Sequence, residues 1–138
     1  MPARDIYHDQ VVHALIADGW KITHDPLRLE LGSKDMYVDI GAEKLLAAQK
    51  DQQKIAVEIK SFIGKSEVQD LRDAVGQYVF YEGVMNEVEP DRILYLAVPQ
   101  SVFNDLFEEP IGQVTIKHAK LRIIIFDEKS EVIIRWIT

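Results

Sequence analysis

The feature that most constrains the fold is an alternation between short β-branched runs and longer stretches of helical periodicity. Residues 5–18 carry apolar side chains at i, i+4, i+7 and i+8 and end before a glycine, which is typical of an amphipathic helix. A second helix is predicted from Ser66, because Gln69 three residues later completes a capping box. A short third helix is predicted over residues 101–107, with Ser101 as its N-cap.

The helical periodicity also predicts which side chains are buried. The stripe of the first helix comprises Tyr7, Val11, Ala14 and Leu15. The stripe of the second helix comprises Val68, Leu71, Val75, Tyr78 and Val79.

The strands are predicted from apolar or alternating runs bounded by turn residues. They cover residues 27–31, 35–41, 54–62, 92–98, 121–126 and 131–137. The polar stretch QKDQQ separates the second run from the third, as expected of a hairpin connection. The predicted order is helix, three strands, helix, strand, helix and two strands. It indicates an α/β (α+β) fold with one central mixed sheet flanked by helices.

The size and composition of the chain exclude several classes of protein. A length of 138 residues fits one domain over residues 1–138, with a hydrophobic core large enough to be stable without disulfide bonds or structural metal ions. The absence of cysteine excludes disulfide scaffolds, thiolate zinc sites and iron–sulfur clusters. The apolar runs are too short to cross a membrane and the N-terminus lacks a signal peptide's apolar core, so we expect a cytoplasmic protein. The four histidines show no metal-ligand spacing and are predicted to be surface or capping residues.

Three charged residues in neighbouring predicted strands form the candidate site. If the hairpin turns between Ala48 and Lys50, Asp39 and Glu58 lie opposite one another. Two carboxylates that close repel, unless a divalent cation such as Mg²⁺ or Mn²⁺ lies between them. Lys60 shares a strand face with Glu58 and can orient or deprotonate a water, or stabilise charge on a phosphate. This arrangement predicts hydrolysis of phosphodiesters.

Plainer interpretations of these residues remain open. Glu58 and Lys60 can form a solvated ion pair, with Asp39 an edge charge. Gln77 and Tyr81 share one face of the helix that follows the Glu-x-Lys strand, as expected of a helix packed on the same site. By themselves these two residues indicate only a polar helix edge.

Together, Asp39, Glu58-Ile59-Lys60 and Gln77-x-x-x-Tyr81 resemble the PD-(D/E)xK nuclease superfamily, with the QxxxY element of its RecB-like branch. The whole chain is also similar to the XisH-type element-excision controlling factors of cyanobacteria, in the stretches KDMYVDIGAEKLLAAQK, KIAVEIKSF and AVGQYVFYE. The resemblance implies a restriction-endonuclease-like fold, with Asp39 and Glu58 as metal ligands and Lys60 as the catalytic lysine. Gln77 and Tyr81 would be the supporting pair that contacts Lys60 or the DNA backbone.

The resemblance also points to an acidic residue on the first helix, for which Asp9 and Glu30 are the candidates. The chain departs from the superfamily pattern at Val38, which replaces the proline before Asp39.

Two functions of different classes follow. The first is a divalent-metal-dependent DNA endonuclease that acts as a controlling factor in excision of a DNA element. The alternative is a non-catalytic accessory factor of the same fold that binds DNA or an XisI-like small protein. The intact set of Asp39, Glu58 and Lys60 favours the first. The partners considered are DNA, the XisI-like protein and a second copy of the chain, while a toxin–antitoxin-like pairing is favoured by no residue.

The charge distribution bears on DNA binding. The formal net charge of −7 opposes an extended phosphate-binding surface. Residues 44–65 nevertheless hold five lysines against two acidic residues, whereas residues 82–109 hold seven acidic residues against Arg92. The hairpin and the mouth of the candidate site are therefore predicted to be mildly basic.

Overall fold

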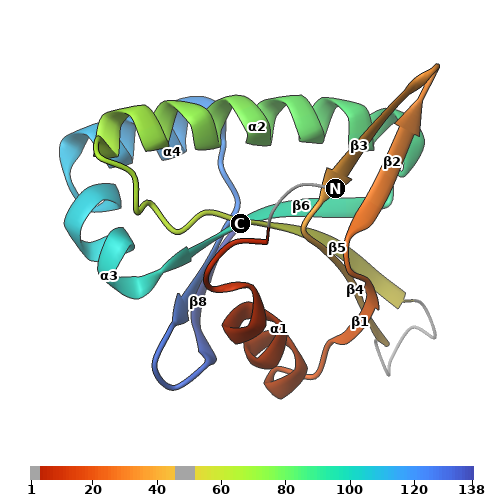
Figure 1. The fold of residues 1–138 in the computed structure, drawn as a ribbon, viewed down its shortest axis with the longest axis horizontal. Coiled ribbons are helices and arrows are strands. Elements are labelled where there is room, and N and C mark those ends of the chain that lie inside the picture. Colours follow the sequence, from red (N-terminus) through yellow and green to blue (C-terminus); the bar gives the residue numbers. More distant parts are fainter. Residues whose placement is uncertain (1–3, 46–51) are drawn as a thin grey trace.

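A six-stranded mixed sheet forms the centre of the molecule in this computed structural model, which describes residues 4–45 and 52–138 (Figure 1). The strands lie in the order β1-β4-β5-β6-β7-β8. β5, β6 and β7 are parallel to one another, and the outer strands are antiparallel to their neighbours. Their bounds are β1 Lys21–His24, β4 Ile40–Leu45, β5 Gln52–Ile59, β6 Arg92–Pro99, β7 Ile123–Asp127 and β8 Val132–Ile137.

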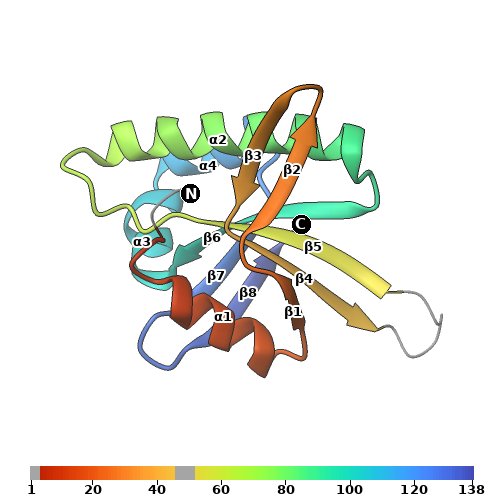
Figure 2. The same ribbon diagram turned by 45° about the vertical axis from the view of Figure 1, so that its right-hand side comes forward.

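Helices cover both faces of this sheet. In both ribbon views α1 lies on one face, and α2 with α4 behind it lies on the other (Figures 1 and 2). The helical segments are α1 His8–Ala17, α2 Glu67–Val88, α3 Gln100–Val102, the π-helical turn η1 Phe103–Phe107 and α4 Pro110–Ala119. None of the described helices combines the length and the apolar character that a bilayer-spanning helix needs.

A separate two-stranded hairpin projects from the central layer. It consists of β2 Leu27–Leu31 and β3 Lys34–Val38, which pair antiparallel and lie beside α2 (Figure 2). Leu27, Leu29 and Val38 anchor the hairpin in the same apolar cluster as the buried face of α2.

The alternation of side chains along β5 divides the core into two clusters. Ile55, Val57 and Ile59 pack with α1, while Ala56 packs with α2. Both clusters are apolar because the central strands are covered on both faces. Glu58 therefore lies on the α2 side of the sheet, two residues after Ala56.

The predicted mixed α/β architecture is confirmed, but the prediction of one continuous strand over residues 35–41 is wrong. The chain bends at Asp39, so that β3 pairs with β2 in the hairpin and β4 joins the central sheet. The expected single sheet is consequently two sheets. The turn expected at residues 48–50 lies outside the described residues.

Other differences concern elements that the sequence patterns did not predict. β1 and α4 were not expected, although Pro110 at the first position of α4 is a helix-start signal. Ser66 caps α2 as predicted, accepting a hydrogen bond from the Gln69 amide at 3.2 Å. The reciprocal half of the predicted capping box is not formed, because the Gln69 side chain bonds Asp73 and Arg72 instead of the Ser66 amide. The prediction for Ser101 is wrong, because the helix begins at Gln100 and Pro99 occupies the N-cap position.

Candidate functional site

The five residues singled out in the sequence line one pocket of about 190 Å³. It lies where β5 ends, and α2 contributes to its wall. The predicted residues in its lining are Asp39, Glu58, Lys60, Gln77 and Tyr81, and the others are Asp5, Tyr37 and Ile59.

The register of β4 and β5 brings the two carboxyl groups together. Ile40 pairs with Val57, so Asp39 and Glu58 form the next opposed positions. The Asp39 amide donates to Glu58 Oε1 at 3.3 Å, and the Ile59 amide donates to Asp39 Oδ2 at 2.8 Å. These reciprocal side chain–backbone bonds satisfy amide groups at the bend and fix both carboxyl groups at the pocket.

Burial makes the charged forms of these two acids unfavourable. Glu58 is only 8% exposed, and burial together with the nearby Asp39 carboxylate raises its pKa to about 9. Burial also raises the pKa of Asp39, against the opposing effect of the Ile59 amide bond. The pair thus holds a proton that two solvated carboxylates would release at neutral pH.

Lys60 follows the end of β5 and remains tied to the sheet through its backbone. Its amide donates to the Ala97 carbonyl on β6 at 3.0 Å. Two residues later Phe62 adopts a left-handed backbone conformation, with φ of 58°, and its ring packs edge-on against Phe107 at a centroid distance of 5.6 Å. The turn that follows Lys60 is therefore held by aromatic packing.

Gln77 and Tyr81 reach the pocket from α2, one helical turn apart. Burial, followed by the proximity of Glu58 and Asp39, raises the pKa of the Tyr81 phenol. Tyr81 is therefore a neutral hydroxyl beside the two acids at physiological pH.

Neither Asp9 nor Glu30, the two candidates for the acidic residue on the first helix, lines the pocket. Asp9 is exposed and contacts Arg4, and Glu30 lies on β2, paired with Arg28. Asp5 lines the pocket instead, and its Oδ2 accepts a hydrogen bond from the Ser61 amide at 3.2 Å. No local sequence pattern predicts Asp5 as a pocket residue, because its hydrogen-bond partner Ser61 is 56 positions away in the chain.

Tyr37 was also missed, although a signal for it exists. It lies two residues before Asp39 in the predicted strand, a spacing that places both side chains on the same side of an extended chain. Tyr37 reaches the pocket from β3.

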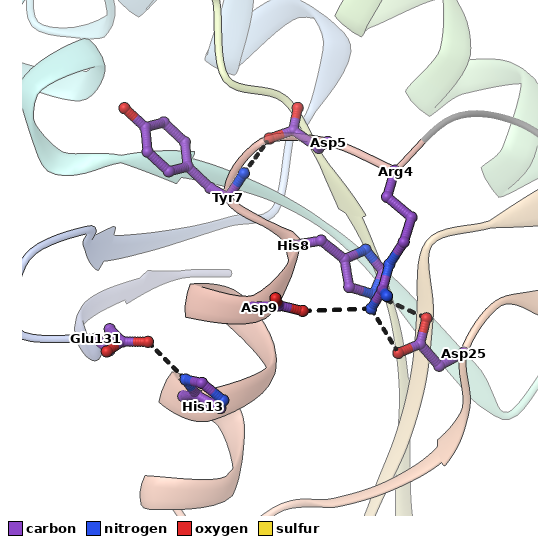
Figure 3. A network of polar contacts seen from close by, with 8 residues as sticks. All are labelled: Arg4, Asp5, Tyr7, His8, Asp9, His13, Asp25 and Glu131. Carbon is purple, nitrogen blue, oxygen red and sulfur yellow. Dashed lines mark hydrogen bonds and ion pairs between the residues drawn. The ribbon is translucent and has the colours of Figure 1, made fainter.

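The prediction that the histidines are surface or capping residues is wrong for His8, which is buried. Figure 3 shows His8 inside a polar network at the start of α1, where its Nε2 lies 2.7 Å from Asp25 Oδ1. His8 is 4% exposed, and its Nδ1 is buried without a hydrogen-bond partner among the described residues. Its proximity lowers the pKa of Asp39, although burial outweighs this effect. By contrast, His13 is exposed and pairs with Glu131 (Figure 3).

The predicted basic mouth of the site is not found. Lys44 lies near Asp18 and Lys54 pairs with Asp91, both at the end of the β4–β5 hairpin away from the pocket. Lys50 lies outside the described residues. Of the lysines in residues 44–65 that the structure describes, Lys60 alone lines the pocket. Lys44 and Lys54 lie towards the turn of the hairpin, away from its open end, and Lys65 lies in the loop before α2.

The donor set at this pocket fits a divalent cation. The carboxyl groups of buried Glu58 and half-buried Asp39 face one another with their charged forms disfavoured, and a hard cation would relieve that repulsion. Within residues 4–45 and 52–138, however, no three acidic or histidine side chains are gathered into a ready-made metal cage. An ion held by Asp39 and Glu58 would complete its coordination with water and substrate oxygens.

Comparison with known proteins identifies the family. A model of the family described as XisH protein matches residues 1–134. Comparison with curated proteins finds no match.

Two crystal structures resemble the chain throughout. One is an XisH family protein from Nostoc punctiforme PCC 73102, with 36% identity, a TM-score of 0.88 and coverage of 97% of this chain and 100% of that one. The other is a fdxN element excision controlling factor protein from Anabaena variabilis, with 39% identity, a TM-score of 0.88 and coverage of 98% and 100%. The family match and these full-length similarities show that the chain belongs to the XisH family.

Proposed function

We propose that this protein is a divalent-metal-dependent DNA endonuclease of the PD-(D/E)xK type, acting as a controlling factor in the excision of a DNA element. The observation that carries the proposal is the shared pocket of Asp39, Glu58, Lys60, Gln77 and Tyr81. The link to excision is taken from the description of the Anabaena variabilis relative.

Each residue of the pocket has a role in this proposal. Asp39 and Glu58 would hold Mg²⁺ or Mn²⁺, which would supply neutralisation of phosphate charge and activation of water. Lys60 orients the attacking water or stabilises the charge that develops on the phosphate. Gln77 and Tyr81 support Lys60 or contact the DNA backbone from α2.

The decisive experiment is a plasmid nicking assay with Mg²⁺ or Mn²⁺. We expect the wild type to nick DNA, and Glu58→Ala and Lys60→Ala each to lower the rate by about a hundredfold or more. Lys54→Ala is the matched control, since Lys54 lies on β5, as Glu58 does, but outside the pocket. Cleavage that survives both pocket substitutions would identify a contaminating nuclease.

Metal binding is measured separately from cleavage. We expect Mn²⁺ to raise the melting temperature of the wild type and of Lys60→Ala, because a ligand that binds the folded state stabilises it. The double variant Asp39→Asn/Glu58→Gln should show no such rise. An unchanged wild-type melting temperature across a Mn²⁺ titration would end the metal proposal.

The second candidate function is a non-catalytic accessory factor that binds DNA or an XisI-like partner. Among the described residues that line the pocket, Lys60 is the only basic one. This scarcity of positive charge is the observation that favours the accessory function. Wild-type protein that does not nick DNA, alone or co-expressed with the XisI-like partner, would favour this function.

A further inference from the structure

The structure leaves exposed two side chains that the helical periodicity assigns to the buried face of α2. Val68 and Val79 are 48% and 51% exposed, and they lie on the stripe that also contains Val75. Val68 and Val75 line a groove of about 630 Å³ between α2 and α4. The opposite wall of this α2–α4 groove includes Ile111 and Val114.

The α2–α4 groove is an apolar surface that the described chain does not cover. Most of its lining surface is apolar, although Arg72, Thr115 and His118 also contribute to it. Val114, in the α4 wall, is 61% exposed. Soluble monomers rarely leave such contiguous apolar surface in water, and patches of this kind mark association sites.

The two ends of the groove carry opposite charges. Figure 1 shows α2 and α4 beginning at the same end of the molecule and running in the same direction. Glu67, Glu108 and Glu109 outnumber Lys65 at the end where both helices begin, whereas Lys117 and Lys120 lie where α4 ends. Arg72 lies in the α2 wall of the groove itself. The three glutamates, Lys117 and Lys120 are exposed, and none of these five takes part in an ion pair within residues 4–45 and 52–138.

We propose that the α2–α4 groove is the interface of a symmetric homodimer. A two-fold axis through the middle of the groove, perpendicular to the helices, lays the groove of a second copy on the first in the antiparallel direction. The acidic end of each copy then meets the basic end of the other, so both ends are complementary. The same contact buries the valine and isoleucine side chains of both grooves.

This interface is separate from the candidate nuclease pocket. Gln77 and Tyr81 are two residues beyond Val75 and Val79, which places them about 200° around α2. One side of α2 thus lines the pocket and the other lines the groove. The dimer leaves the pocket open, and its test does not depend on metal binding or cleavage.

The first test measures the mass of the full chain in solution across a dilution series. We expect the wild type to be a dimer that dissociates on dilution, and Val114→Asp to be a monomer at every concentration. Ile16→Asp is the matched control, because Ile16 is a comparably exposed helical residue on α1, on the other face of the sheet. Circular dichroism establishes that each variant is folded.

The second test uses charge reversal and mixing. We expect Lys117→Glu/Lys120→Glu and Glu108→Lys/Glu109→Lys each to be monomeric alone, since each places like charges at both ends of the contact. Mixed together, the two variants should form a heterodimer, because their altered ends are complementary and their native ends still match. If these charges serve only to complement the helix dipole of α4, mixing the two variants would not restore association.

Three results would overturn the proposal. They are a wild type that is monomeric at all concentrations, a dimer that Val114→Asp leaves intact, and variants that do not associate on mixing. A monomeric wild type whose groove binds an added amphipathic helix would assign the groove to another partner.

Discussion

Glu58 is a carboxyl group held where a negative charge is unfavourable. It is almost fully buried, faces Asp39, and accepts a hydrogen bond from the Asp39 amide. Among the described residues no buried cationic partner neutralises Glu58, as the partner in a structural ion pair would. The proposed metal ion would take that place.

This burial predicts how stability depends on pH when metal is chelated. The folded-state pKa of Glu58, about 9, lies above the ordinary value of 4.5, so the folded state retains a proton that unfolding releases. Stability from this group is therefore complete below about pH 4.5 and is lost as the pH rises towards 9.

Glu58→Gln should flatten this dependence, because the amide stays neutral throughout. We expect the variant to match the wild type near pH 4.5 and to melt at a higher temperature near pH 9, in thermal melts with EDTA. Glu87→Gln, at an exposed position on α2, serves as the control. A wild type whose stability rises over this range would contradict the burial of the pair.

At the scale of elements, α2 links three parts of the molecule. Its buried face packs on the sheet, a second side contributes Gln77 and Tyr81 to the pocket, and a third lines the α2–α4 groove. A single helix therefore contributes to the core, to the pocket and to the groove.

The Ser66 cap is expected to stabilise α2. Ser66→Ala removes the hydrogen bond to the Gln69 amide, and we expect a loss of about 1 kcal/mol in the free energy of unfolding, measured by urea denaturation. Ser101→Ala is an informative control, because the sequence suggests a cap at both serines and the structure has one only at Ser66. Equal losses for the two variants would show that the helix starts are wrongly assigned.

At the scale of the whole molecule, Arg92 joins the sheet to the end of α2. Arg92 is 3% exposed, and its guanidinium donates to the Ile55 carbonyl at 2.9 Å and pairs with Glu43 and Glu89. It thereby ties β4, β5 and the turn before β6 at the edge remote from the pocket.

Removing this tie should destabilise the whole fold. Arg92→Ala leaves two glutamates and a carbonyl without their partner, and we expect a loss of about 3 kcal/mol in the free energy of unfolding. Arg28→Ala, which removes an exposed arginine from the β2–β3 hairpin, should change stability little. Similar losses for the two variants, seen as similar shifts of the urea midpoint, would contradict the buried role of Arg92.

Much of the core and part of the site followed from local patterns. Val11, Ala14 and Leu15 are buried on α1 as their spacing predicted, and the hairpin register brings Asp39 opposite Glu58. Periodicity fails for Val68 and Val79, because the position of α4 determines which side of α2 is covered. A pattern along one helix carries no information about a neighbour that comes later in the chain.

The sequence by itself determined the strand and helix alternation, the family and the residues of the Glu-x-Lys strand, since these depend on spacing within a few residues. The tertiary structure alone decided that the chain bends at Asp39, that Asp5 enters the pocket, and that most lysines of the hairpin lie elsewhere. The physical reason is that burial and proximity are properties of segments distant in sequence. They also decide which acids keep a proton and which apolar side chains remain exposed.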